Sequence, residues 1–178
     1  EPAAVYVCDD SAEDADYIRK QALKMGEETP LAIKGHTYHF DGINDLARDK
    51  TSTRYLLRPS VFLGSDINST DRDTGLEEIR ELLKGCMRGK EMIVRFFCLG
   101  PTKSDFSIPC VQITDSYYVS HSEGILYRSG YEEFSSIGDS EEFFRFMHTA
   151  GELENGISKN TDKRRMYIDL EEDIVYSA

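Results

Sequence analysis

The sequence predicts an α/β fold in which a mixed β-sheet is flanked by helices. Helical and β-type segments alternate along all 178 residues, with no internal repeat and no low-complexity tract. The run Glu91–Leu99 is almost continuously apolar, which is typical of a central strand covered on both faces. Near the end, Arg165–Leu170 and Ile174–Ser177 alternate apolar and polar residues across Glu171–Asp173, which indicates a β-hairpin. We therefore expect one domain over residues 1–178, without an internal boundary.

The first half of the chain is expected to form short β-type pieces and two helices. Ser11 is placed to cap the first helix, because its hydroxyl can accept from an N–H group of the first turn. Thr74 and Glu77 have the spacing of a capping box for the second helix. The expected elements, in order, are a strand Ala4–Cys8, a helix from Ser11 to about Lys24, a hairpin or bend of Leu31–Lys34 and Thr37–Phe40, apolar pieces Tyr55–Leu57 and Val61–Leu63, and a helix Gly75–Lys84 ended by Gly85.

The second half is organised around the run Glu91–Leu99 and a second β-type run, Cys110–Thr114. Asp115-Ser116 is a good cap for the helix that follows. Another helix is expected from Gly138 to about Ala150, with an apolar face rich in phenylalanine. A loop over Glu152–Lys163 then leads to the hairpin.

Composition excludes several classes of function. The net charge of −12 argues against non-specific nucleic-acid binding, which needs a basic surface, but one local cationic pocket is enough for an anionic ligand. The longest apolar run is too short to cross a bilayer, and no signal peptide opens the chain. The four cysteines form no C-x-x-C pair, so we expect free thiols in a reduced, cytoplasmic protein. The chain does not start with Met, and we expect it to be a fragment.

Several groups of polar residues have residue types that occur in functional sites, and each has a plainer interpretation. Neither G-x-x-x-x-G-K followed by Ser or Thr nor G-x-G-x-x-G can be read in the chain, so no phosphate loop is expected. His36 and His39 lie on a predicted strand, which separates their side chains, and His121 and His148 are expected to have packed or capping roles on helices. Nothing fixes the geometry of Ser104, Asp105 and Ser107 relative to His121. Glu171–Asp173 is expected to be a solvated turn, and Lys163-Arg164-Arg165 a solvated strand entry.

Four stretches carry a resemblance to a known family. They are Cys8-Asp9-Asp10-Ser11, the segment GCMRGKEMIVRFFCLGP (Gly85–Pro101), the ITDS turn (Ile113–Ser116) and YYVSHSEGILYRSG (Tyr117–Gly130). In this order the chain resembles the amino-terminal domain of GTP-dependent phosphoenolpyruvate carboxykinase. The ATP-dependent branch has a different sequence here, so the likeness is to the GTP branch.

The resemblance implies a function for the whole enzyme. It would convert oxaloacetate and GTP to phosphoenolpyruvate, GDP and CO₂ in gluconeogenesis, as a cytoplasmic decarboxylating lyase that uses Mn²⁺ and Mg²⁺. The nucleotide-binding carboxy-terminal domain and the metal ligands would lie outside this chain. No catalytic, metal-binding or nucleotide-binding residue is therefore expected within residues 1–178, and this fragment alone is expected to be inactive.

Arg48 is the one substrate-binding residue that the resemblance implies. It lies in GINDLARDKTST, which is similar to the family segment D-x-x-D-V-A-R, whose arginine binds the carboxylate of oxaloacetate or phosphoenolpyruvate. A guanidinium group suits this role, because it can hold a carboxylate with two hydrogen bonds and stays charged. The plainer interpretation is a surface arginine paired with Asp45 or Asp49. This chain departs from the family at Lys50, where better-known members carry a glutamate.

Two other classes of function remain open from the sequence. One is a stand-alone binding module for a small carboxylic acid. The other is a non-catalytic interaction domain, for which an acidic surface would suit a basic partner. The sequence leaves the oligomeric state, the nucleotide preference and the regulation open.

Overall fold

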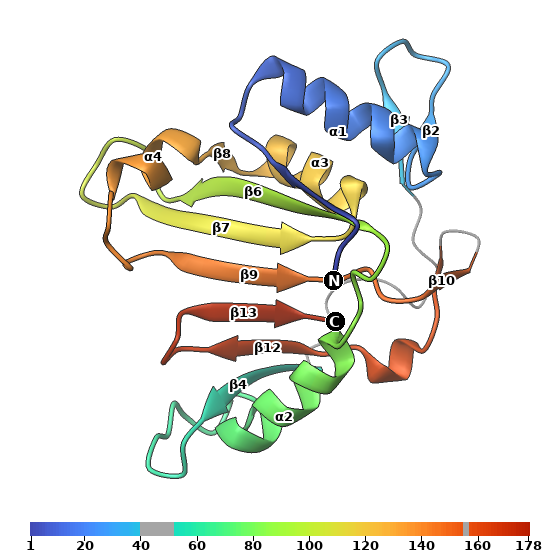
Figure 1. Cartoon of the computed structure of the whole chain (residues 1–178). Coiled ribbons are helices and arrows are strands. Elements are labelled where there is room, and N and C mark those ends of the chain that lie inside the picture. Colours follow the sequence, from blue (N-terminus) through green and yellow to red (C-terminus); the bar gives the residue numbers. More distant parts are fainter. Residues whose placement is uncertain (40–51, 155–156) are drawn as a thin grey trace.

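A nine-stranded mixed sheet is the frame of the molecule in the computed structural model, which describes residues 1–39, 52–154 and 157–178 (Figure 1). The strand order is β1-β6-β7-β9-β13-β12-β4-β5, and β8 pairs with β6. The strands are β1 (Ala4–Val7), β4 (Thr53–Leu57), β5 (Ser69–Asp71), β6 (Glu91–Leu99), β7 (Ile108–Thr114), β8 (Arg128–Ser129), β9 (Phe144–His148), β12 (Met166–Asp169) and β13 (Ile174–Ser177). The predicted class, α/β with a mixed sheet flanked by helices, is confirmed.

Strand direction places three strand ends together. β7, β9 and β13 are parallel to one another, while β6 and β12 run the opposite way on either side of them. The carboxyl ends of the three parallel strands therefore meet at one edge of the sheet, beside the first residues of β6, β12 and β4. Both chain termini lie at this edge (Figure 1).

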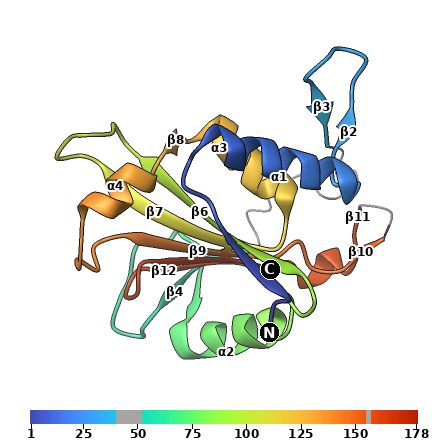
Figure 2. The same ribbon diagram turned by 45° about the horizontal axis from the view of Figure 1, so that its top comes forward.

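Helices cover opposite faces at opposite ends of the sheet (Figure 2). α1 (Ala12–Lys24) and α3 (Tyr117–Leu126) pack over β1 and β6, where Cys8, Ile18 and Ile93 form a buried cluster. α2 (Arg72–Leu83) packs over β4 and β12 on the other face, and its buried cluster is Leu56, Leu76, Ile79 and Tyr167. Each core is therefore made by one helical stripe lying on alternate residues of neighbouring strands.

The helix caps were predicted correctly in two cases and wrongly in one. The Ser11 hydroxyl accepts from Asp14 N at 3.2 Å, and the Ser116 hydroxyl accepts from Val119 N at 3.2 Å. For α2 the cap is Asp71, which accepts from Thr74 N at 3.0 Å, so the helix begins three residues earlier than the capping box indicated. Pairing of β5 with β4 fixes this earlier start.

The helix predicted from Gly138 to Ala150 is wrong, because β9 (Phe144–His148) occupies this region. Its apolar residues fit a helix stripe and a buried strand almost equally well. The segment forms a strand because it fills the place between β7 and β13 and hydrogen-bonds to both. A short helix that the sequence did not indicate, α4 (Tyr131–Ser136), packs Phe134 against Phe96 of β6.

Small hairpins account for most of the remaining chain. The predicted hairpin of β12 and β13 is confirmed. β2 (Thr29–Pro30) pairs with β3 (Thr37–Tyr38), so the proposed strand Leu31–Lys34 is the turn between them. β10 (Leu153–Glu154), β11 (Ile157–Ser158) and the 3-10 helix η1 (Thr161–Lys163) lie where a plain loop was expected, and Val61–Leu63 is not a strand.

The cysteines behave as the sequence indicated. All four are free, and Cys8, Cys98 and Cys110 are buried, where a thiol packs as a small apolar group. Cys86 is half-buried. No helix in the part of the chain that the structure describes has the length and apolar character needed to span a membrane.

Candidate functional site

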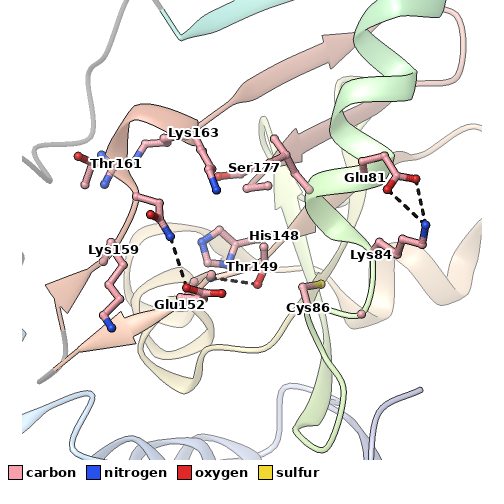
Figure 3. A pocket seen from close by; sticks show the side chains of 18 of the residues that line it. Glu81, Lys84, Cys86, His148, Thr149, Glu152, Lys159, Thr161, Lys163 and Ser177 are labelled. Atoms are coloured by element: carbon pink, nitrogen blue, oxygen red, sulfur yellow. Dashed lines mark hydrogen bonds and ion pairs between the residues drawn. The ribbon is translucent and has the colours of Figure 1, made fainter.

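A cavity of about 620 Å³ lies at the edge where the parallel strands end (Figure 3). Its walls are the end of α2, the first turn before β6, the ends of β9 and β13, and the segment from β11 through η1. Ligand sites of α/β proteins occur at the carboxyl ends of parallel strands, and this volume is in the range that holds a small molecule. We refer to it as the strand-end pocket.

Among the described residues that line the strand-end pocket, cationic side chains outnumber acidic ones, although the whole chain carries −12. The cationic residues in this described lining are Lys84, Lys90, Lys159, Lys163 and Arg164, and the acidic ones are Glu81 and Glu152. An acidic protein can still carry a local cluster of cations, and the fold assembles this one from residues far apart in the chain.

Most of these lysines already have carboxylate partners. Lys84 Nζ lies 3.2 Å from Glu81 Oε1, and Lys159 Nζ lies 3.5 Å from Glu154 Oε2. The side chain of Lys163 is exposed and has no ion-pair partner within residues 1–39, 52–154 and 157–178. Its ammonium group extends over the pocket toward His148 (Figure 3). Lys163 is therefore the cation that is most available to a ligand.

Asp115 of the ITDS turn fixes one wall of the pocket. Its side chain is fully buried, and its Oδ2 accepts from Lys90 Nζ at 2.5 Å and from Thr149 Oγ1 at 2.8 Å. Its Oδ1 accepts from Ala150 N at 2.8 Å. One carboxylate thus ties the start of β6 to the turn after β9, and it holds Lys90 at the pocket wall.

His148 lies at the end of β9 and lines the pocket (Figure 3). Its Nδ1 is 2.8 Å from Thr114 Oγ1. Burial lowers the pKa of His148 to about 4, with Lys90 acting in the same direction and Asp115 in the opposite one. The imidazole is therefore neutral near pH 7. The predicted position of this packed histidine on a helix is wrong, because the segment is a strand.

Cys86 also lines the pocket, next to the turn that follows α2. Burial raises the pKa of its thiol, and the nearby Asp115 acts in the same direction against Lys90 and Thr149. The side chain is therefore a protonated thiol near pH 7, which is a poor nucleophile. It lines the pocket as a half-buried free thiol.

Arg48, the substrate-binding residue expected from the sequence, lies outside the described residues, as do Asp45, Asp49 and Lys50. The first described residue after this segment is Ser52, whose carbonyl oxygen accepts from Met166 N at 3.0 Å. Met166 begins β12 and lines the strand-end pocket. Ser52 therefore lies next to the residue with which β12 enters the pocket wall.

The other histidines weighed from the sequence have structural partners. The ring of His39 stacks on Tyr118 with centroids 3.6 Å apart. His121 lies on α3 as expected, and its Nδ1 is 2.6 Å from Glu28 Oε1. Among the residues whose placement is described, no three His, Cys, Asp or Glu side chains gather as a metal site would require.

Ser104 and Ser107 have the geometry of a turn. Both hydroxyls donate to the carbonyl oxygen of Pro101, at 3.1 and 2.7 Å. His121 is engaged with Glu28 on another element. The serines and the histidine are therefore each committed to separate contacts, and they do not form a nucleophile and base.

The two charged runs near the carboxyl end lie in a largely exposed turn and just before β12, and both take part in ion pairs. Glu171 accepts from Arg58 Nε at 2.7 Å and from Arg58 Nη2 at 2.8 Å, while both side chains stay substantially exposed. Of the basic triplet, Arg165 donates to Glu78 Oε1 at 2.9 Å, whereas Lys163 and Arg164 line the pocket. Three adjacent cations in an acidic chain were the signal available for this wall of the pocket.

Comparison with known proteins connects this chain to one family. The model of the phosphoenolpyruvate carboxykinase N-terminal domain matches residues 1–178. The chain is 56% identical over 179 residues to a protein of Pyrococcus horikoshii and 58% identical over 178 residues to one of Thermococcus kodakarensis. It is 45% identical over 177 residues to one of Saccharolobus solfataricus. All three relatives are named phosphoenolpyruvate carboxykinase (GTP). These alignments cover 99–100% of this chain but 27–29% of the relatives, so the chain spans less than a third of their length.

Proposed function

Because the chain belongs to the phosphoenolpyruvate carboxykinase N-terminal domain family, we propose that it is the amino-terminal domain of a GTP-dependent phosphoenolpyruvate carboxykinase. The whole enzyme converts oxaloacetate and GTP to phosphoenolpyruvate, GDP and CO₂, and it acts in gluconeogenesis in the cytoplasm. The observation that carries this proposal is the identity of 56% and 58%, over the length of this chain, to two relatives with that name.

We assign different roles to the two parts of the enzyme, because residues 1–178 lack certain sequence motifs but offer a binding surface. No phosphate loop can be read in them, and the described residues gather no metal-binding group. We assign GTP, Mn²⁺ and Mg²⁺ to the carboxy-terminal part of the enzyme, which supplies the phosphate and metal chemistry. The present chain contributes one wall of the substrate cleft, and by itself it does not turn over oxaloacetate.

Arg48 is the residue that we assign to the substrate carboxylate. The carbonyl oxygen of Ser52 accepts from the N–H group of Met166, which lines the strand-end pocket, and four residues of extended chain span at most about 14 Å. A guanidinium within that reach holds a carboxylate with two charge-assisted hydrogen bonds. Holding oxaloacetate in one orientation aligns the bond that is cleaved in decarboxylation with the oxygen that accepts the phosphoryl group.

Steady-state kinetics of full-length Arg48→Ala test this assignment. A charge-assisted hydrogen bond contributes about 1.5–3 kcal/mol, so kcat/KM for oxaloacetate should fall about 10- to 100-fold, largely through KM. Arg128→Ala is the matched control, because Arg128 is an exposed arginine on β8. Equal KM values for the two variants would remove Arg48 from the substrate site.

A second candidate function is a binding module for a small carboxylic acid, which the cationic lining of the strand-end pocket favours. Titration of oxalate into residues 1–178 alone distinguishes the two. Tight binding that is independent of the rest of the enzyme supports the module, whereas binding that needs the full-length protein supports the carboxykinase domain.

A further inference from the structure

The two edges of the main sheet differ in how well they are protected from further strand pairing. β5 (Ser69–Asp71) closes one side with a short polar strand, and its last residue carries an exposed charge. β1 (Ala4–Val7) closes the other side with the sequence AVYV, which contains no charge, no proline and no glycine. Natural proteins usually block an edge strand with charges, prolines or bulges, because its free backbone groups can pair with another strand. The described residues place no further strand beside β1, so this edge is open to pairing.

The backbone groups that point to the open edge belong to Val5 and Val7. β1 is parallel to β6 with Val7 in register with Val94, and Cys8 N donates to Val94 O at 2.9 Å. In a parallel pair only alternate residues of a strand bond to a given neighbour. Tyr6 and Cys8 therefore bond to β6, whereas the N–H and C=O groups of Val5 and Val7 point away from it. The edge thus offers two donors and two acceptors, two residues apart.

The side chains of Val5 and Val7 lie on the sheet face opposite α1 and α3, and each is 54% exposed. Tyr6 between them points to the other face, which α1 and α3 cover (Figure 2). Its ring stacks on Tyr17 with centroids 4.1 Å apart, and its hydroxyl donates to Asp14 Oδ1 at 2.5 Å. β1 is therefore held firmly from one face, while it presents two exposed valines and four outward backbone groups at the same place.

From this geometry we propose that β1 pairs with β1 of a second copy of the protein, in an antiparallel arrangement about a two-fold axis at Tyr6. Val5 of each copy then lies opposite Val7 of the other, and the two residues exchange both of their backbone hydrogen bonds. The exposed valines of both copies meet on one face as cross-strand pairs of β-branched residues. The axis places Asp9 opposite Ala3, so the acidic residues that follow β1 do not face each other.

Two observations favour a second copy over an unrelated strand. The outward groups are symmetric about Tyr6, so a single two-fold rotation satisfies all of them. The chain carries −12, which makes two copies repel each other, and β1 is an uncharged part of the surface at which they can approach. A contact of one short strand is small, so we expect a dimer that depends on protein concentration. The inference does not rest on the carboxykinase assignment.

Sedimentation analysis of the full-length protein measures this pairing, because the average mass should rise from one copy toward two as the protein concentration increases. Val7→Pro removes the donors of two of the four intermolecular hydrogen bonds, and it should raise the dissociation constant about 10- to 100-fold. It removes no bond to β6, since the Val7 N–H points away from that strand, and proline is tolerated at such edge positions. Val7→Thr is the matched control, because it keeps the N–H group and the branched shape and should dimerise nearly as the wild type does.

Two double variants test the register of the pairing. Val5→Lys with Val7→Glu places opposite charges across the two-fold pair, so the dimer should persist. Val5→Lys with Val7→Lys places like charges there, so the dimer should be lost. Both variants change the same two exposed side chains, so a difference between them reports the pairing of two copies and not the folding of β1.

Three results would overturn the proposal. A full-length protein that stays monomeric at every concentration contradicts it. A dimer that Val5→Lys with Val7→Lys leaves intact places the interface elsewhere on the molecule. Hydrogen exchange of the monomer gives the third result, since Val5 and Val7 amides that are already protected there mean that another part of the same polypeptide covers β1. Failure of the Arg48 kinetics alone leaves this interface in place.

Discussion

Two buried ionic regions, one on each face of the sheet, use the same kinds of side chain and differ in how completely those side chains are paired. Under α2, Arg72 donates from Nε to Asp169 Oδ1 at 3.1 Å and from Nη2 to Asp169 Oδ2 at 2.8 Å. Arg72 Nη2 also reaches Glu172 Oε1 at 2.8 Å. Asp169 is completely buried, and both of its oxygens are hydrogen-bonded.

Under α3, the pairing is incomplete. Arg95 Nη2 is 3.6 Å from Asp10 Oδ1, which is too long for a hydrogen bond. The other oxygen of Asp10 accepts from Gly130 N and Tyr131 N, both at 2.9 Å. Glu123 is buried, and within the described residues its Oε2 has no partner.

The difference shows that burial alone does not decide what an ionic group does. A buried carboxylate whose two oxygens are hydrogen-bonded to a cation holds two elements in register. A buried carboxylate without partners gives up its charge instead, and burial raises the pKa of Glu123 to about 8 although Arg95 acts in the opposite direction. The ion pair under α2 is therefore a fixed contact between α2 and β12, whereas the stability of the region under α3 is expected to depend on pH.

The largest expected effect on stability is at the Arg72–Asp169 pair, in which both carboxylate oxygens are hydrogen-bonded. Arg72→Met should lower the free energy of unfolding by about 3–5 kcal/mol, because it leaves Asp169 buried without its cation. Denaturant unfolding measures this loss. The double variant Arg72→Met with Asp169→Leu removes both charges and should recover much of it; a double variant as unstable as the single one would contradict this account.

The next effect is a pH dependence of stability that originates at Glu123. Its pKa rises from 4.5 to about 8 on folding, so the folded state holds a proton that the unfolded state has released between these values. Stability from this group is full below pH 4.5 and is lost as pH rises toward 8. The pKa of His148 is lowered from 6.5 to about 4, which acts in the opposite direction, but only below pH 6.5.

The window between pH 6.5 and 8 therefore isolates Glu123 from His148. There, Glu123→Gln should flatten the stability curve, with a difference in slope of up to about 1.4 kcal/mol per pH unit. Glu132→Gln is the matched control, because Glu132 is an exposed glutamate. Parallel curves for wild type and Glu123→Gln would mean that Glu123 is ionised in the folded protein.

The smallest effect is expected where a bidentate pair lies in solvent. Arg58 makes three hydrogen bonds to Glu171, at 2.7, 3.0 and 2.8 Å, yet both side chains are substantially exposed. Water screens this pair, so Arg58→Gln should leave the melting temperature close to that of the wild type at moderate salt. A loss of stability comparable to that of Arg72→Met would show that the geometry of an ion pair matters more than its burial, which contradicts this account.

Local chemistry was enough to predict most of the sheet and two of the helix caps. The bounds of β6 (Glu91–Leu99) follow from a nearly continuous apolar run, and Ser11 and Ser116 cap helices because a hydroxyl serves free N–H groups wherever it occurs. The prediction of a helix from Gly138 to Ala150, where β9 lies, is wrong for a physical reason. β9 has apolar residues at three of its five positions, a pattern without a clear period, and pairing with β7 and β13 on either side selected the strand.

For the candidate site, the sequence by itself determined the residue types and the family, including the ITDS turn and the basic triplet, while the role of Arg48 stays a prediction. Only the tertiary structure decided that Asp115, His148 and Lys163 serve one cavity, because they come from three separate elements. Their meeting depends on β7, β9 and β13 running parallel, so that distant strand ends share one edge. Strand direction is a long-range property of the sheet, and no local pattern in the chain specifies it.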